Sequence, residues 1–548
     1  TTIIVSLFCF LHAYTKNFKL VVYGLAAIAI LLFGGIFISS MVQKVYVEPN
    51  EFNLEKEYLE RNIQHTLYAY DLADVKVRDF PVSYNLSAQD LSNNEVTIEN
   101  VRLWDWRPLL PTNRQLQLFR TYYDFVDVDV DRYTIDGKLR QLMVSPRELD
   151  QNQLDDKAKT WINKHFVFTH GYGAVVSPVN RVSPEGLPEL FVQDIPPKSV
   201  HENLAITQPG IYFGEEAHEY VVINTKSKEF DYPLGNENVF ATYGGKDGVP
   251  LSSMLRRAIY GIKFSSLNLF VSGAITKESK ILLNRNVKER ASIIAPFLQY
   301  DSDPYIVISE GKLFWMMDAY TTSRSFPYSE SVSGINYIRN AVKVVVDAYD
   351  GTISFYIVDD KDPIIQNYAK IFPGLFKSMN EMPGSLKEHI RYPEDMMRIQ
   401  STIYGTYHMK DVQVFYNKED SWRTSKEIYD SSEVEMRPYF VIMKLPGDKE
   451  EGFYLITPYI PRGKDNMIAW FTAYSDPEQY GTLEVFELSK QELVYGPMQI
   501  EARINQDTEI SQQLTLWNQQ GSEVIRGNLL VIPIEQSFIY IEPIYLKS

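Results

Sequence analysis

The sequence is almost free of cysteine, and this absence excludes several classes of protein. Cys9 is the single cysteine among 548 residues, so no disulfide forms within the chain and no cysteine-based zinc site can be built. Cys9 lies in an apolar run, and the rest of the chain contains no cysteine. The rest of the chain therefore cannot be an enzyme that uses a cysteine nucleophile.

The motifs of several common enzyme classes are missing as well. No G-x-S-x-G nucleophile elbow is present. The His-Glu pair at 201–202 is followed by Ala205 where a zinc protease needs its second histidine. Phe240 stands where a P-loop ending at 244–246 would need its first glycine. These absences leave no recognisable catalytic motif.

Positive charge is scarce relative to negative charge. The chain has a formal net charge of −16, and residues 1–47 contain lysines but no acidic residue, so the acidity belongs to the remainder. A negative field of this size disfavours nucleic acid and anionic lipid headgroups as main partners. We therefore expect no nucleic-acid function.

Charge is absent altogether from one long segment near the start. Leu20–Val42 is a run of 23 uncharged, mostly apolar residues between Lys19 and Lys44. A helix of this length crosses a hydrocarbon core of ~30 Å, whereas the apolar core of a signal peptide is shorter. The run predicts a transmembrane helix over 20–42, and residues 1–14 are expected to be the end of a preceding membrane helix.

The remaining sequence alternates helix signals with hairpin signals. Strand patterns over 305–309 and 312–319 flank a Glu-Gly turn, and those over 342–349 and 352–358 flank an Asp-Gly turn. The Asp-Pro pair at 362–363 is typical of a helix start, with Asp as the cap and Pro in the first turn.

Helices and hairpins mix without a regular βαβ alternation, so the predicted class is α+β. We expect an N-terminal transmembrane helix, preceded by the end of another, and then a large mixed α+β soluble domain rich in antiparallel hairpins. The predicted division is a transmembrane region over 1–47, an α+β subdomain over 48–300 and a strand-rich α+β subdomain over 301–548.

Several long strings carry a resemblance to a known family. They include VEPNEFNLEKEYLERNIQHT, WDWRPLLPTNRQLQLFRTYYDFVDVDVDRYTIDG, THGYGAVVSPVN and IRGNLLVIPIEQSFIYIEPIYL. With these strings the chain closely resembles uncharacterised protein family 0182, a group of bacterial and cyanobacterial multi-pass membrane proteins. The resemblance implies a cell-membrane location, several N-terminal membrane helices and a large extracytoplasmic domain. It also implies that this chain is a fragment, and it implies no known reaction and no catalytic residues.

Three aspartates alternate with valines after residue 126. Asp127, Asp129 and Asp131 would share one face of a strand, and carboxylate oxygens are the ligands that Ca²⁺ prefers. An EF-hand is excluded, because Arg132 replaces its glycine and Lys138 its closing glutamate. Calcium is therefore a candidate ligand here, against the simpler interpretation of a strand with a solvated acidic face. No other cofactor is predicted.

Five further residues are candidates for ligand binding. His170 is followed by two glycines in HGYG, Trp104 and Trp106 offer indoles that stack on sugars, and Glu501 and Arg503 lie in a polar C-terminal helix. For each, a structural role is the alternative: a histidine in a glycine turn, indoles that anchor a loop, and an internal ion-pair network.

Two functions from different classes fit these observations. The first is an envelope component whose extracytoplasmic domain binds a partner protein, a lipid bilayer or a cell-wall polymer; it predicts no compact cluster of perturbed carboxylates and histidine in a deep pocket. The alternative is an envelope hydrolase that cleaves glycans with paired carboxylates, about 5–9.5 Å apart in an aromatic-lined cleft. A transport component is a third, weaker alternative.

Overall fold

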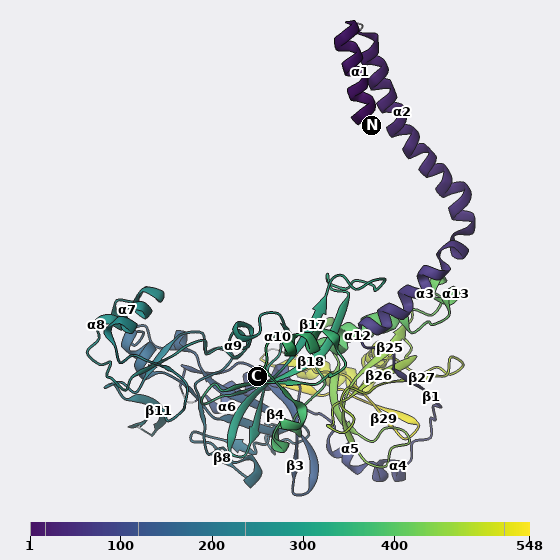
Figure 1. Cartoon of the computed structure of the whole chain (residues 1–548). Helices are drawn as coiled ribbons and strands as arrows, with labels where there is room; N and C mark the ends of the chain where they lie inside the picture. Colours follow the sequence, from purple (N-terminus) through teal and green to yellow (C-terminus); the bar gives the residue numbers. More distant parts are fainter. Residues whose placement is uncertain (1, 17, 119, 236, 520, 548) are drawn as a thin grey trace.

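A computed structural model describes residues 2–16, 18–118, 120–235, 237–519 and 521–547. Two helices, α1 (Thr2–Thr15) and α2 (Lys19–Val42), lie side by side and project from the body of the molecule (Figure 1). The short turns η1 (Gln43–Val47) and η2 (Glu48–Asn50) join α2 to α3 (Glu51–Ala69), which packs on the body.

The predicted transmembrane helix over 20–42 is wrong. α2 occupies that range, but no helix in the part of the chain that the structure describes is both long and apolar enough to cross a membrane. A span needs about 20 consecutive apolar residues, and the described residues do not supply such a helix. α1, expected to be the end of a preceding span, has 14 residues.

Most of the body is built on three six-stranded sheets. The first has the order β1-β27-β26-β25-β21, with β24 paired to β25. β1 runs parallel to β27, with Lys76 opposite Glu484, so residues near the start of the body complete a sheet formed mainly by the C-terminal third. The bounds are β1 (Lys76–Phe80), β21 (Trp422–Thr424), β24 (Tyr439–Met443), β25 (Gly452–Pro461), β26 (Ala469–Tyr474) and β27 (Leu483–Leu488).

The second and third sheets pack against each other through buried aliphatic and aromatic side chains. The second has the order β2-β4-β6-β7-β8, with β3 paired to β4, and the third has the order β15-β17-β18-β19-β20, with β16 paired to β17. Val144 and Val176 of the second sheet share one core with Trp315 and Val344 of the third. The bounds of the second sheet are β2 (Tyr123–Phe125), β3 (Asp129–Ile135), β4 (Lys138–Leu149), β6 (Ala174–Pro178), β7 (Val192–Gln193) and β8 (Lys198–Ser199). Those of the third are β15 (Gln299–Tyr300), β16 (Tyr305–Ser309), β17 (Lys312–Ser323), β18 (Tyr337–Asp347), β19 (Ile353–Ile357) and β20 (Phe376–Ser378).

The local signals in the sequence locate the turns of the third sheet. β16 and β17 pair antiparallel across the Glu-Gly turn, with Ile308 opposite Leu313, and β18 and β19 pair across the Asp-Gly turn. α10 (Pro363–Ile371) begins at Asp362, whose side chain accepts hydrogen bonds from the backbone N–H groups of Ile364 and Ile365. The body is mixed α+β, and the predicted division at residue 300 stays a prediction.

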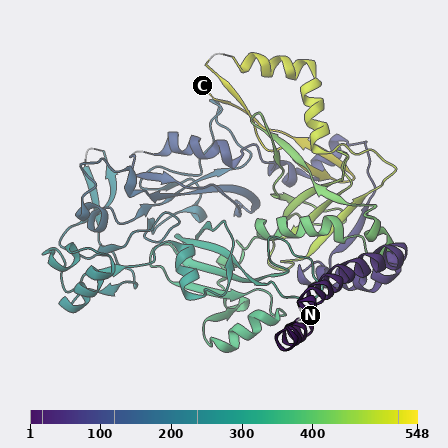
Figure 2. The same cartoon turned by 90° about the horizontal axis from the view of Figure 1, so that it is seen from above.

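The remaining elements cover the sheets or extend from them. Figure 2 shows α14 and α15 (yellow) projecting as an arm from one edge. The helices are α4 (Ala88–Asn93), α5 (Glu95–Glu99), α6 (Trp106–Gln117), α7 (Met254–Lys263), α8 (Asn268–Val271), α9 (Val287–Ile294), α11 (Gly384–Lys387), α12 (Glu394–Tyr407), α13 (Val412–Asn417), α14 (Pro497–Gln506) and α15 (Thr508–Trp517), with short turns η3 (Gln151–Gln153), η4 (Asn163–Val167), η5 (Glu202–Leu204) and η6 (Met379–Glu381). The short strands are β5 (Gly171–Tyr172), β9 (Gly210–Ile211), β10 (Val221–Ile223), β11 (Glu229–Leu234), β12 (Glu237–Ala241), β13 (Val249–Pro250), β14 (Lys280–Leu282), β22 (Lys426–Tyr429), β23 (Ser432–Glu435), β28 (Glu523–Arg526), β29 (Leu530–Ile534), β30 (Ser537–Ile541) and β31 (Ile544–Lys547).

Candidate functional site

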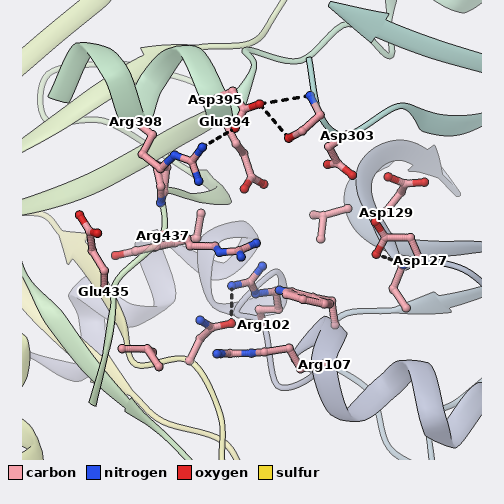
Figure 3. Close-up of a pocket in the computed structure, with 18 of the residues that line it drawn as sticks. Arg102, Arg107, Asp127, Asp129, Asp303, Glu394, Asp395, Arg398, Glu435 and Arg437 are labelled. Carbon is pink, nitrogen blue, oxygen red and sulfur yellow. Dashed lines mark hydrogen bonds and ion pairs between the residues drawn. The ribbon is translucent and has the colours of Figure 1, made fainter. Parts of the chain in front are cut away.

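A cavity of about 510 Å³ lies where segments from distant parts of the sequence meet (Figure 3). They are the loop before α6 with the first turn of that helix, the segment that enters β3, the turn between β15 and β16, the start of α12, and the hairpin β22-β23 with the residues after it. Their lining residues fall within 102–107, 127–130, 301–303, 391–398 and 427–439, together with Asn528. Most of the residues that line the cavity are charged or aromatic.

Carboxyl groups form one side of this cavity. Asp127, Asp129 and Asp303 lie together, and Glu394 faces the same space from the start of α12 (Figure 3). The guanidinium of Arg391 holds two of them, with its Nη2 3.0 Å from Asp303 Oδ2 and 3.5 Å from Asp129 Oδ1. We call these four acidic residues the acid wall.

Three carboxyl groups of the acid wall have raised pKa values. Burial, opposed by Arg391 and assisted by the neighbouring Asp127 carboxyl, raises the pKa of Asp303 to about 6. Burial, assisted by Asp303, raises the pKa of Glu394 to about 7. Burial also raises the pKa of Asp129 well above its ordinary value. The envelope-component hypothesis predicts no compact cluster of perturbed carboxylates and histidine, and among the described residues the cavity lining has the carboxylates but no histidine, so the cluster meets that criterion only in part.

Two arginines reach into the cavity from the side opposite the aspartates (Figure 3). Arg102 is 7% exposed, and among the described residues its only side-chain hydrogen bond is a long one of 3.4 Å from Nη2 to Asn528 Oδ1. Arg437 is exposed and lies over the Trp106 ring, with its guanidinium carbon 5.7 Å from the ring centre. Neither guanidinium forms an ion pair with any carboxylate in the described residues. We call them the arginine pair.

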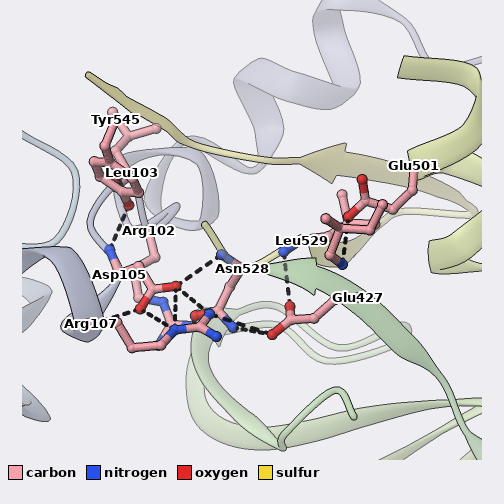
Figure 4. A network of polar contacts seen from close by, with 10 residues as sticks. Arg102, Leu103, Asp105, Arg107, Glu427, Glu501, Asn528, Leu529 and Tyr545 are labelled. Atoms are coloured by element: carbon pink, nitrogen blue, oxygen red, sulfur yellow. Dashed lines mark hydrogen bonds and ion pairs between the residues drawn. The ribbon is translucent and has the colours of Figure 1, made fainter. Parts of the chain in front are cut away.

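A third arginine in the cavity, Arg107, differs from the arginine pair because it is paired with carboxylates. Arg107 donates to both oxygens of Asp105 from Nε, at 3.0 and 3.1 Å, and its Nη2 lies 3.5 Å from Glu427 Oε1 (Figure 4). Asn528 bridges the two acids, because its backbone N–H donates to Asp105 at 3.0 Å and its side chain donates to Glu427 at 2.9 Å. Asp105 also caps α6. This network fixes one arginine, whereas the arginine pair has no ion-paired carboxylate among the described residues and Arg102 attracts Glu394 only from beyond ion-pair distance.

The structure brings only some of the candidates from the sequence to the cavity. Trp106, Asp127 and Asp129 line it. Asp131 lies outside it, with its Oδ2 2.7 Å from His389 Nδ1. Trp104 is buried and anchors its loop, since its Nε1 donates to the carbonyl oxygen of Arg181 at 2.9 Å. The aspartates of β3 do not form a solvated face, because Asp129 and Asp131 are buried.

His170 lies in a different part of the body. Its Nδ1 is 2.8 Å from the Thr169 hydroxyl and its Nε2 is 3.1 Å from Asp231 Oδ1. Its neighbour Gly171 lies against the backbone of the adjacent strand, where an added Cβ would be 2.4 Å from the carbonyl oxygen of Arg147. The glycine therefore allows close approach of a strand.

The C-terminal candidates form structural contacts. Glu501 is buried and pairs with Arg526, and burial raises its pKa to about 7. The guanidinium carbon of Arg503 lies 4.6 Å from the centre of the Tyr495 ring. Neither residue lines the cavity, although Glu501 accepts a hydrogen bond of 3.2 Å from the backbone N–H of Ile428, which lies between two lining residues.

No group of three or more histidine, cysteine or carboxylate side chains in the described residues has the arrangement of a metal site. The calcium hypothesis for Asp127, Asp129 and Asp131 stays a prediction. The three carboxylates do not face one space, since Asp131 pairs with His389 outside the cavity.

Sequence reasoning missed most residues that define the cavity. Arg102, Asp303, Glu394 and Arg437 belong to no motif and are separated from one another by up to several hundred positions. The one local signal was the Pro-Glu-Asp run at 393–395, which is typical of a helix start but says nothing of a cavity.

With the cavity described, comparison with known proteins locates the chain among its relatives. The sequence profile of the Uncharacterised protein family (UPF0182) matches residues 1–517. A UPF0182 protein of Methanospirillum hungatei is 53% identical over 555 residues, covering 100% of this chain and 61% of that protein. The chain belongs to the UPF0182 family. UPF0182 proteins of Pelotomaculum thermopropionicum and Trichodesmium erythraeum are 53% and 48% identical, over 98% and 100% of this chain and 59% and 62% of their own lengths.

The chain spans about three fifths of the length of the curated UPF0182 relatives it matches. No solved structure matches it. The family prediction from the sequence strings is confirmed, and because the UPF0182 description states no reaction, function has to be argued from the cavity.

Proposed function

We propose that this part of the UPF0182 protein binds an anionic, hydroxyl-rich ligand in the cavity, of the class of a phosphate- or uronate-bearing cell-wall polymer. The observation that carries the proposal is the arginine pair, in which Arg102 is buried without a carboxylate partner. A buried cation costs free energy unless an anion compensates it. Guanidinium groups bind phosphate and carboxylate through paired hydrogen bonds, so a ligand of this kind would supply the direct ion-pair partner that the arginine pair lacks among the described residues.

The other side of the cavity suits the hydroxyl groups of the same ligand. Carboxyl oxygens of the acid wall accept hydrogen bonds from hydroxyls, and the proton that Glu394 retains near neutral pH reduces repulsion of an anion. The indole of Trp106 adds an aromatic surface of the kind that sugars stack on. A small inorganic anion alone would contact only the arginine pair, whereas a sugar or polyol phosphate would contact both sides.

Calorimetric titration of the full chain tests this proposal. The probes are an oligomer of glycerol phosphate, an oligogalacturonate and a neutral cello-oligosaccharide. We expect at least one anionic probe to bind and the neutral probe to bind more weakly. Arg437→Gln should weaken anionic binding about tenfold or more, because one charge-assisted contact is lost.

Arg324→Gln is the matched control, since Arg324 is also an exposed arginine and lies outside the cavity. It should leave affinity unchanged. Absence of binding by both anionic probes, or equal binding by the two variants, contradicts the proposal.

Hydrolysis of the bound glycan is a second candidate function, supported by the acid wall. With a pKa of about 7, Glu394 retains a proton that a general acid needs, while Asp303, with a pKa of about 6, is the more easily ionised partner. Release of new reducing ends from the bound probe would establish turnover. Glu394→Gln should then abolish release and keep binding, and a chain that binds without any release is a binding protein only.

An extracytoplasmic position of the cavity belongs to the same proposal, because ligands of this class lie outside the cytoplasm. The loop over 183–190, which contains the exposed Leu187, is a suitable protease target. Cleavage there in intact cells supports the position, and protection until lysis contradicts it.

A further inference from the structure

An exposed apolar surface lies at the end of the body opposite the α2 helix, on helices α7 and α8 (Figure 1). Along α7, Leu255, Ile259 and Ile262 are 71%, 52% and 80% exposed. Their spacing of four and three residues places them on one face of the helix. Leu267 and Val271, in and beside α8, add side chains that are 73% and 62% exposed. We call these five residues the α7–α8 apolar face.

The opposite side of the two helices is firmly attached to the body. Arg257 donates from Nε to the carbonyl oxygen of Leu251 at 2.9 Å and from Nη2 to that of Ile275 at 3.1 Å. The Phe264 ring stacks on Tyr220 with 4.4 Å between ring centres. These contacts attach the other side of the helices to the body, so the α7–α8 apolar face points away from it.

Charge around this face differs from charge in the rest of the protein. Residues 251–272 contain three basic residues and no acidic residue, although the whole chain has a net charge of −16. At about 100° per residue, Arg256 and Lys263 lie next to each other along one edge of the apolar face. The acidity elsewhere is screened beyond about 8 Å in physiological salt, so it does not cancel this local positive edge.

We propose that α7 and α8 form a lipid-binding element that lies in the surface of an anionic bilayer. A helix with large apolar side chains on one face and basic residues at its edge inserts that face about 5–10 Å into the boundary between headgroups and acyl chains. Arg256 and Lys263 then contact lipid phosphates. The surface is remote from the cavity, so this inference goes beyond the proposed function and does not depend on it.

The test needs a local readout, because apolar side chains are also exposed on α1 and α2. In a full-length Cys9→Ser background, Ile262→Cys carries a nitroxide label. The control label is at Val200→Cys, since Val200 is also apolar and 69% exposed but lies next to β8. Electron paramagnetic resonance compares access of oxygen and of a water-soluble nickel reagent to each label.

On vesicles of equal phosphatidylglycerol and phosphatidylcholine, we expect the label at 262 to gain access to oxygen and lose access to the nickel reagent. The label at 200 should not change. Arg256→Glu with Lys263→Glu should lower the inserted fraction of the 262 label strongly, because each basic residue near an anionic surface contributes about fivefold to binding.

Two results would overturn the inference. One is a label at 262 that stays as water-accessible as the label at 200, which would leave a protein partner as the occupant of this face. The other is insertion that is equal on pure phosphatidylcholine vesicles and unaffected by the double charge reversal.

Discussion

Replacing Arg102 with methionine should weaken ligand binding while leaving the fold as stable as before or more stable. Methionine keeps most of the side-chain length but removes a charge that is 7% exposed and makes only a 3.4 Å hydrogen bond to Asn528. A hydrogen bond to a charged group contributes about 1.5–3 kcal/mol, so the dissociation constant of an anionic probe should rise about 10- to 150-fold. Replacing a buried charge with an apolar group of similar volume is often neutral or stabilising by about 1–4 kcal/mol.

Arg107→Met is the matched comparison, because here the same substitution should lower the stability of the fold. Arg107 neutralises Asp105 and Glu427, whose side chains are 0% and 2% exposed. Without their cation, these buried carboxylates should cost about 3–5 kcal/mol of unfolding free energy.

Urea denaturation and calorimetric titration of both variants measure the two quantities. If Arg102→Met destabilises the fold as much as Arg107→Met and leaves probe affinity unchanged, Arg102 is a structural residue and the reasoning fails.

Three further predictions concern the acid wall, a buried ion pair and a close backbone contact. Because burial raises the pKa of Glu394 from 4.5 to about 7, the unfolding free energy should fall as pH rises from about 4.5 to 7, and Glu394→Gln should flatten that slope in urea titrations at several pH values. Lys343 and Asp318 are 0% and 3% exposed and form an ion pair at 2.6 Å. Lys343→Met should therefore lower the unfolding free energy by about 3–5 kcal/mol in the same assay. A double variant that also replaces Asp318 with leucine should recover much of that unfolding free energy. Gly171→Ala should destabilise by about 1–3 kcal/mol, because its Cβ would be 2.4 Å from a carbonyl oxygen of Arg147; an unchanged melting temperature would show that the strand can shift.

Features set by neighbouring residues were predictable. The two hairpins of the third sheet and the start of α10 depend on turn and cap residues within a few positions of each other, and the structure has them at those places. Longer helical patterns were less reliable. The polar C-terminal helix expected around Glu501 and Arg503 is followed by a second helix, α15, because Asp507 caps that helix and has an extended backbone conformation.

The candidate site was predictable only in part. The alternation of aspartate and valine pointed to Asp127 and Asp129, but not to the division that leaves Asp131 with His389. Trp104 and Trp106 are two positions apart, and the structure buries the first and directs the second to the cavity. Which of two such residues meets a ligand depends on what packs against each of them.

By itself the sequence determined the family, the acidic charge and the location of individual turns, because each of these is a property of adjacent residues or of their sum. Only the tertiary structure decided that Arg102 and Arg437, more than three hundred residues apart, face an acid wall assembled from three other segments. It also decided which arginine is neutralised and which is not. Long-range packing sets those distances, and the strength of charge interactions and the pKa values of carboxyl groups depend on distance and burial rather than on order along the chain.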